Sequence, residues 1–175
     1  VDNIPLSRIH VMGGEPVLIK KYNEFIDYLI ANNRLEISLS FVSNGTLVNQ
    51  QLIDKLKLFK NVDLELSVEA LDKTNDYIRQ GSSIETLMKT IETLHCQQTE
   101  NLQLVLRSVP QLLNIHCYTD YIRFAWEKQL IIESIPLTRP KFLAVSVLPF
   151  EYRQRLRSKF EELYTELSSN ITGIN

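Results

Sequence analysis

Residues 9–16, IHVMGGEP, change character halfway along the segment. The first half is mostly apolar, which predicts a short β-strand at 9–12. The second half joins two glycines to a carboxylate and a proline, and this combination predicts a sharp turn that leads into a helix. Apolar side chains then recur at helical spacing over residues 17–32, so a strand, a tight turn and a helix are expected in succession.

The same order of elements recurs along the rest of the chain. Strand-like segments begin roughly every 25–40 residues, and helical patterns lie between them. Such alternation predicts an α/β fold of βαβ units with a parallel sheet and right-handed crossovers. Periodicity alone is compatible with an open doubly wound sheet and with part of a (β/α) barrel. The predicted strands are 9–12, 36–43, 62–69, 102–109 and 130–137, and a last helix is predicted at about 150–168.

Composition excludes several classes of protein. The chain has 175 residues, of which 44% are hydrophobic and 23% are charged, and its formal net charge is −2. These values are typical of a soluble globular domain, and we expect a single domain over residues 1–175. Without a strong basic field, we expect no nucleic acid and no anionic membrane surface as partners. No apolar run reaches the roughly 18–20 residues that a membrane span needs.

Cysteine and histidine give no metal signature. Cys96 and Cys117 stand alone, and His10, His95 and His116 have no partners at metal-ligand spacing. We therefore expect no metal ligands in this chain. Two isolated thiols indicate a reducing, cytoplasmic setting rather than a disulfide framework.

Glycines and polar residues gather where the predicted strands end. Since the carboxyl ends of parallel strands lie at one edge of the sheet, these residues predict a functional site at that edge. No catalytic residue stands out among them. The strand ends carry Gly13-Gly14-Glu15-Pro16, Ser43-Asn44-Gly45-Thr46, Ser67 and Glu69 with Arg79 following, Arg107-Ser108, and Ile135-Pro136.

Three of these motifs, taken in order, resemble the radical S-adenosylmethionine (radical SAM) superfamily. They are Met12-Gly13-Gly14-Glu15-Pro16, then Asn44-Gly45-Thr46, then Ser67-Val68-Glu69 followed by NDYIRQGS at Asn75–Ser82. The resemblance covers residues 9 to about 137. Later segments at 140–143 and 147–149 are similar to members with SPASM or twitch auxiliary domains.

The resemblance implies a fold and a chemistry. The implied fold is a partial (β/α)6 TIM-like barrel of parallel strands whose first strand is missing here. In the family, a Cys-x-x-x-Cys-x-x-Cys loop after that strand holds a [4Fe-4S] cluster. The cluster cleaves SAM to a 5′-deoxyadenosyl radical, which abstracts a hydrogen atom from the substrate. Because the loop is not among these residues, we expect the chain to be inactive alone, as a piece of a longer enzyme or the product of a truncated gene.

The resemblance also implies cofactor-binding residues. Main-chain carbonyls of Gly13, Gly14 and Glu15 suit the SAM ammonium group, and Arg79 suits its carboxylate. Glu69 stands where many relatives have Asp. Each residue also has a structural alternative, such as a tight turn, a satisfied serine or a core isoleucine. The implied set is Gly13, Gly14, Glu15, Pro16, Ser43, Asn44, Ser67, Glu69, Arg79, Arg107 and Ile135.

The resemblance also leads us to expect particular partners, and two alternative functions stay open. By family analogy we expect a peptide or protein substrate, an electron donor, and self-association through the unpaired edge of the strand at 9–12. One alternative is a non-catalytic α/β scaffold or partner-binding module that has lost the cluster. Another is an unrelated βα protein that uses Gly13-Gly14 to hold phosphate at a helix start.

Overall fold

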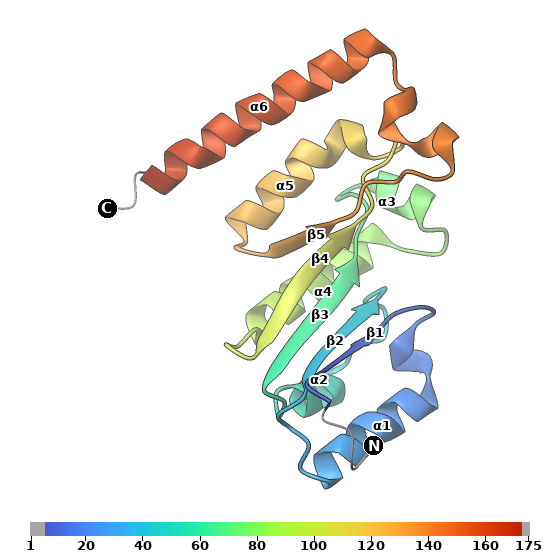
Figure 1. Cartoon of the computed structure of the whole chain (residues 1–175), viewed down its shortest axis with the longest axis vertical. Coiled ribbons are helices and arrows are strands. Elements are labelled where there is room, and N and C mark those ends of the chain that lie inside the picture. The colour runs from blue at the N-terminus through green and yellow to red at the C-terminus, as the bar shows by residue number, and fades with distance from the viewer. Residues whose placement is uncertain (1–5, 173–175) are drawn as a thin grey trace. The chain divides into compact units, whose positions relative to one another are not determined.

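The computed structural model describes residues 6–172, and within that range strands and helices alternate (Figure 1). The strands are β1 (Arg8–Val11), β2 (Ser38–Ser43), β3 (Asn61–Ser67), β4 (Leu102–Ser108) and β5 (Ile131–Ser134). The α-helices are α1 (Lys20–Ala31), α2 (Gln50–Leu56), α3 (Lys73–Ile78), α4 (Ile84–Gln97), α5 (Tyr118–Glu127) and α6 (Phe150–Thr172). Short 3-10 turns are η1 (Pro16–Leu18), η2 (Ile115–Cys117), η3 (Lys141–Leu143) and η4 (Val145–Val147). None of these described helices is long and apolar enough to span a membrane.

The strands are parallel, as the alternation predicts. β1 pairs with β2, β2 with β3 and β3 with β4, all in parallel register, and the strands follow one another in chain order. In this register Ile9 lies opposite Leu39, and Leu64 lies opposite Leu104. The α/β class with a parallel sheet is therefore confirmed, and the carboxyl ends of β1–β4 lie at one edge.

The strand limits differ from the predicted ones by at most three residues. β3 ends at Ser67 rather than Glu69, because the Glu69 N–H donates to the side chain of Asn75 instead of continuing the ladder. β5 ends at Ser134 rather than residue 137, since Pro136 has no N–H to offer. The last helix runs to Thr172, beyond the predicted residue 168.

The chain divides into two compact units. The first unit runs to Val68 and includes Ser82–Arg107, so it contains the paired segments of β1–β4 with α1, α2 and α4. The second unit comprises Glu69–Gly81 and the chain from Ser108 onward, with α3, α5, β5 and α6.

The sheet of the first unit has one apolar face and one polar face. On the apolar face, Tyr22 of α1 contacts Phe41 of β2 with ring centroids 5.7 Å apart. Alternate residues of β3 and β4 on this face are fully buried leucines, namely Leu64, Leu66, Leu104 and Leu106. The intervening positions carry Ser40 on β2, Glu65 on β3 and Arg107 on β4, so polar side chains gather on the opposite face.

The second unit packs α5 against α6. Leu156 and Leu163 of α6 are buried, and Arg123 of α5 donates to Glu166 of α6 at 2.8 Å. Tyr118 and Tyr121 of α5 stack with ring centroids 5.2 Å apart. Burial raises the pKa of the Tyr121 phenol far above its ordinary value, so this group stays neutral.

The two stacked tyrosines predict opposite effects of losing a hydroxyl. The Tyr121 hydroxyl is buried without a hydrogen-bond partner among the described residues, whereas the Tyr118 hydroxyl bonds to Ser134. A buried polar atom without a partner costs about 1–3 kcal/mol, and a typical hydrogen bond contributes about 1 kcal/mol. Tyr121→Phe is therefore expected to raise the free energy of unfolding by about 1 kcal/mol, measured by urea denaturation. Tyr118→Phe is the matched control and should lower it, and the reverse order would contradict the assignment.

Candidate functional site

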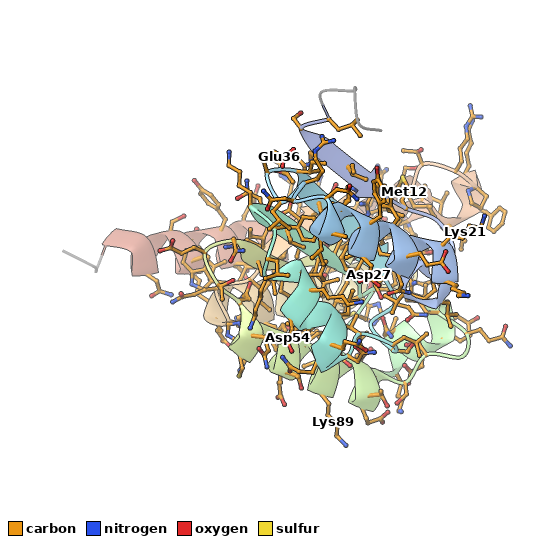
Figure 2. All side chains as sticks on the ribbon, turned by 90° about the horizontal axis from the view of Figure 1, so that it is seen from below. Met12, Lys21, Asp27, Glu36, Asp54 and Lys89 are labelled. Carbon is orange, nitrogen blue, oxygen red and sulfur yellow. The ribbon has the colours of Figure 1, made fainter. Side chains whose placement is uncertain are left out.

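The Gly13-Gly14 turn presents open backbone at the end of β1. Gly13 has φ +98° and Gly14 has φ +60°, in the left-handed region that favours glycine. A Cβ added at either position would meet no atom within 4 Å. Met12, which precedes the pair, is 61% exposed (Figure 2). Glycine is required here by the backbone conformation and not by packing, and the space beside the turn is free.

The Glu15 carboxylate holds this turn against the end of β2. Its Oε1 accepts from the Ser43 hydroxyl at 2.9 Å and from the Val17 N–H at 3.3 Å. Its Oε2 accepts from the Asn44 N–H at 2.7 Å. Because the Val17 contact caps η1, one carboxylate fixes both the turn and the start of the following helix.

The carbonyl oxygens of the turn are used unequally. The Glu15 carbonyl accepts from the Leu18 N–H at 3.1 Å, as part of η1. Among the described residues, no hydrogen bond engages the carbonyls of Gly13 and Gly14. The two glycines are therefore the better acceptors for a ligand ammonium group, and Pro16 serves as the first residue of η1.

The predicted residues after β2 form a closed turn. The Ser43 side chain is buried and also accepts from the Gly45 N–H at 3.0 Å. The Asn44 side chain accepts from both the N–H and the hydroxyl of Thr46, at 2.9 and 2.7 Å. Ser43 and Asn44 thus lie beside Glu15, and their side chains already have partners within the protein.

Ser67 and Arg107 lie side by side at the ends of β3 and β4, where they are register partners. The Arg107 guanidinium donates to the carboxylate of Glu65, which is 4% exposed. Sequence reasoning missed Glu65. Its signal was the alternation of VDLELSVE at 62–69, which puts Asp63, Glu65 and Ser67 on one face.

In the second unit, Glu69 holds Arg79. Glu69 is 5% exposed, and its Oε1 accepts from Arg79 Nη1 at 3.1 Å. Its Oε2 accepts from the Val109 N–H at 2.9 Å. Arg79 is the C-cap residue that follows α3, and a third of its side chain is exposed. The Glu69 carboxylate is thus occupied by protein donors, and it directs the arginine.

Two fully buried asparagines complete this arrangement. Asn75 Oδ1 accepts from the Glu69 N–H at 3.0 Å, and Asn114 Nδ2 donates to the Glu69 carbonyl at 2.9 Å. Both asparagines are 0% exposed. Asn75 belongs to the NDYIRQGS motif, whereas nothing in the sequence pointed to Asn114. Ile135 follows β5, is 52% exposed, and donates its N–H to the Ser108 carbonyl at 3.2 Å.

The described residues do not fit an iron–sulfur cluster. No group of three histidine, cysteine or carboxylate side chains within residues 6–172 could hold a metal ion. Cys96 is exposed on α4, and Cys117 is half-buried in η2. Burial raises the pKa of the Cys117 thiol, which favours the protonated form that does not bind iron.

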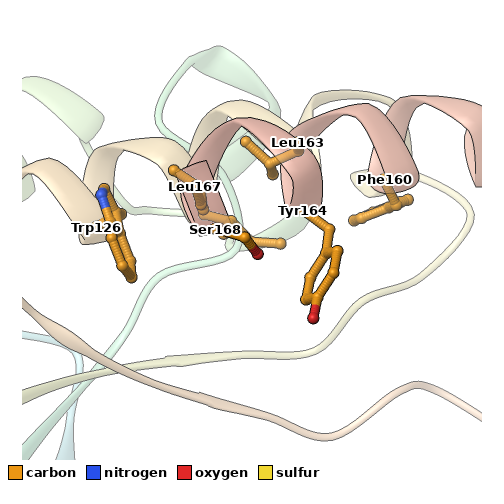
Figure 3. A pocket seen from close by; sticks show the side chains of 7 residues that line it. Trp126, Phe160, Leu163, Tyr164, Leu167 and Ser168 are labelled. Atoms are coloured by element: carbon orange, nitrogen blue, oxygen red, sulfur yellow. The ribbon is translucent and has the colours of Figure 1, made fainter. Parts of the chain in front are cut away.

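A groove between α5 and α6 is apolar and unsuited to this chemistry (Figure 3). Its volume is about 370 Å³. It carries no carboxylate, amine or imidazole. The lining residues are Ile122, Trp126, Phe160, Leu163, Tyr164, Leu167 and Ser168.

The features above define a class of protein: an α/β protein with a parallel sheet, in which a turn with two glycines follows the first described strand. Residues 1–106 match the Radical SAM superfamily, and because the match covers more than half of the chain, the chain belongs to that superfamily.

Relatives and solved structures agree with this membership. The mycofactocin maturase MftC from Mycobacterium ulcerans (strain Agy99) is 26% identical over 95 residues, which are 54% of this chain and 25% of that protein. The radical SAM cyclopropyl synthase TigE from Paramaledivibacter caminithermalis is 28% identical over 109 residues, which are 62% of this chain and 22% of that protein. The chain spans about a quarter of the length of these relatives.

The fold is similar to that of SuiB from Streptococcus suis. The TM-score is 0.67 at 17% identity, and the match covers 91% of this chain and 36% of SuiB. SuiB has also been solved bound to S-adenosylmethionine and bound to the precursor peptide SuiA. At this identity the likeness shows the fold, and it confirms the prediction of a radical SAM type of α/β architecture.

The three contacts of Glu15 predict a stability effect. Glu15→Gln keeps one acceptor oxygen but turns an amide donor toward either the Ser43 hydroxyl or the Asn44 N–H. Because hydrogen bonds to charged groups contribute about 1.5–3 kcal/mol, the variant should lose about that much unfolding free energy. Urea denaturation measures it. Glu24→Gln is the control, since Glu24 makes an exposed pair with Lys20 at 3.4 Å, and equal losses in both variants would contradict the role of Glu15.

Proposed function

We propose that this chain is the SAM-binding core of a radical SAM enzyme, with residues 1–175 as one core. The observation that carries the proposal is the open Gly13-Gly14 turn, whose carbonyls have no partner among the described residues. Superfamily membership supports it, and so does the solved complex of SuiB with S-adenosylmethionine.

The proposed cofactor-binding residues are considered one unit at a time. In the first unit, the carbonyls of Gly13 and Gly14 would accept hydrogen bonds from the SAM ammonium group, with Glu15 and Pro16 holding the turn. Ser43, Asn44, Ser67 and Arg107 at the same sheet edge complete the proposed set in this unit. In the second unit, Arg79 would bind the carboxylate with the guanidinium donors that Glu69 leaves available. Ile135 would offer an exposed apolar surface.

The whole enzyme is proposed to act on a peptide. When SAM is bound beside a reduced [4Fe-4S] cluster, it supplies the radical with which this superfamily removes a hydrogen atom from a substrate. MftC is named a maturase, and SuiB has been solved with a precursor peptide, so both support a peptide substrate. We further propose a SPASM or twitch relationship, an electron donor, a cytoplasmic setting, and self-association through the edge of β1.

Binding of S-adenosylhomocysteine (SAH) to this chain tests the proposal without the cluster. Arg79→Ala removes a charged pair with the ligand carboxylate, and Gly14→Val places a branched side chain at φ +60° beside the free carbonyls. Since such contacts contribute about 1.5–3 kcal/mol, each change should weaken binding by about ten- to a hundredfold in calorimetry. Thermal unfolding of each variant shows whether the fold is kept.

Arg123→Ala is the matched control, because Arg123 pairs with Glu166 on the surface of the same unit. It should bind SAH as the parent protein does. Unchanged affinity in Arg79→Ala and Gly14→Val would remove those assignments. Binding of inorganic phosphate without binding of SAH would overturn the proposed function in favour of a phosphate site at the glycine turn.

The Glu69 contact predicts a second, indirect effect on SAH binding. Glu69→Gln keeps the side-chain length but removes the charge that directs Arg79, so the arginine would sample more orientations. The expected result is a loss of SAH affinity smaller than that of Arg79→Ala. In the double variant, Glu69→Gln should add no further loss, as a calorimetric double-mutant cycle would show. Additive losses would mean that Glu69 acts independently of Arg79.

A further inference from the structure

Four polar side chains form a continuous chain of contacts across the first unit. His10 Nδ1 on β1 lies 2.7 Å from the Ser40 hydroxyl on β2. That hydroxyl donates to Glu65 Oε1 on β3 at 2.6 Å. Arg107 on β4 donates to the other oxygen of the same carboxylate. The proposed SAM contacts do not use His10, Ser40 or Glu65.

The direction of these hydrogen bonds fixes the protons. Ser40 is 1% exposed, and its single hydroxyl proton is given to Glu65. The Ser40 oxygen can then only accept from His10, so the proton of a neutral His10 lies on Nδ1. In that tautomer Nε2 has no proton, and its lone pair is available as an acceptor.

Two ion pairs lie on the same face of the sheet as His10. Alternation along the strands puts Arg8 and Asp63 on the same face as Glu65 and Arg107, and Arg8 donates to Asp63 at 2.9 Å. These four groups make two ion pairs, and Glu65 Oε1 also lies 3.6 Å from His10 Nδ1. The His10 side chain is 36% exposed. Among the described residues, no hydrogen bond engages its Nε2 atom.

We propose that His10, Ser40 and Glu65 form a relay that presents His10 Nε2 as a fixed hydrogen-bond acceptor for an N–H or O–H donor of a bound substrate. The identity of the donor rests on the function proposed above: it is a main-chain amide of the peptide substrate. The relay keeps the acceptor in one tautomer before the ligand binds, so binding does not have to reorganise it.

Nitrogen NMR of the folded chain tests the tautomer directly. In ¹⁵N-histidine-labelled protein at mildly alkaline pH, His10 should show a protonated Nδ1 and an unprotonated Nε2, with its signals assigned by their loss in His10→Gln. Ser40→Ala should shift the population toward the Nε2–H tautomer. Ser38→Ala is the matched control, because Ser38 lies on the same face of β2 and bonds to Asn61 instead. A proton on Nε2 in the parent protein would overturn the relay, even if Ser40→Ala failed to fold.

Diethyl pyrocarbonate tests whether the acceptor is open, since it reacts with an unprotonated imidazole nitrogen. Mass spectrometry should find His10 modified in the folded protein, with a rate that falls several-fold in Ser40→Ala and is unchanged in Ser38→Ala. An unreactive His10 beside a modified His116, which is exposed, would overturn the acceptor site. SAH titration of the same samples distinguishes a failure of the proposed SAM-binding function from a failure of the His10 relay. Loss of SAH binding with the Nδ1–H tautomer retained would count against the proposed function and not against the relay.

Discussion

The candidate site of the first unit depends on the parallel register of β1–β4. Because the strands run in one direction, their carboxyl ends meet at one edge, and the turn after β1 comes within reach of the end of β2. A slip of one residue would exchange the two faces of a strand. Glu65 would then enter the apolar face, and Leu64 would replace it beside Arg107. The pairing of polar groups across the strands is therefore part of what specifies the register.

Three glutamates hold neighbouring groups in place, two of them in the first unit and one in the second. Glu65 and Glu69 are buried, and Glu15 is partly buried. A buried carboxylate is costly unless it is fully paired, and each of the three has at least two donors. Glu15 binds a hydroxyl and two N–H groups, Glu65 binds Ser40 and Arg107, and Glu69 binds Arg79 and a main-chain N–H. The Gly13-Gly14 turn, His10 and Arg79 are thus oriented by contacts inside the protein. Such preorganisation lowers the cost of ordering them when a ligand binds.

The sequence predicted the parts of this arrangement that have local signals. Hydrophobic periodicity gave the order of strands and helices, and Gly-Gly-Glu-Pro gave the turn after β1. It did not predict the distant partners of the glutamates, because the contacts of Glu15 with Ser43, of Glu65 with Arg107 and of Glu69 with Val109 join residues 28, 42 and 40 positions apart. It predicted Arg107 and Glu69 as cofactor-binding residues, but it did not predict that their side chains contact Glu65, Arg79 and the Val109 N–H. Asn114 had no local signal at all, since its role is defined only by the Glu69 carbonyl that it contacts.

A comparison of three glycines shows why the role of the Gly13-Gly14 turn could not be predicted from the sequence alone. Gly13, Gly14 and Gly45 all have positive φ, so the same residue type satisfies the same backbone requirement. A Cβ at Gly45 would approach Leu66 and Leu87 to 3.2 Å, whereas at Gly13 and Gly14 it would meet nothing within 4 Å. Gly45 therefore allows close packing as well as the turn. The glycine pair loses conformational entropy on folding with no packing gained in exchange, and a ligand that uses its free carbonyls would offset that loss.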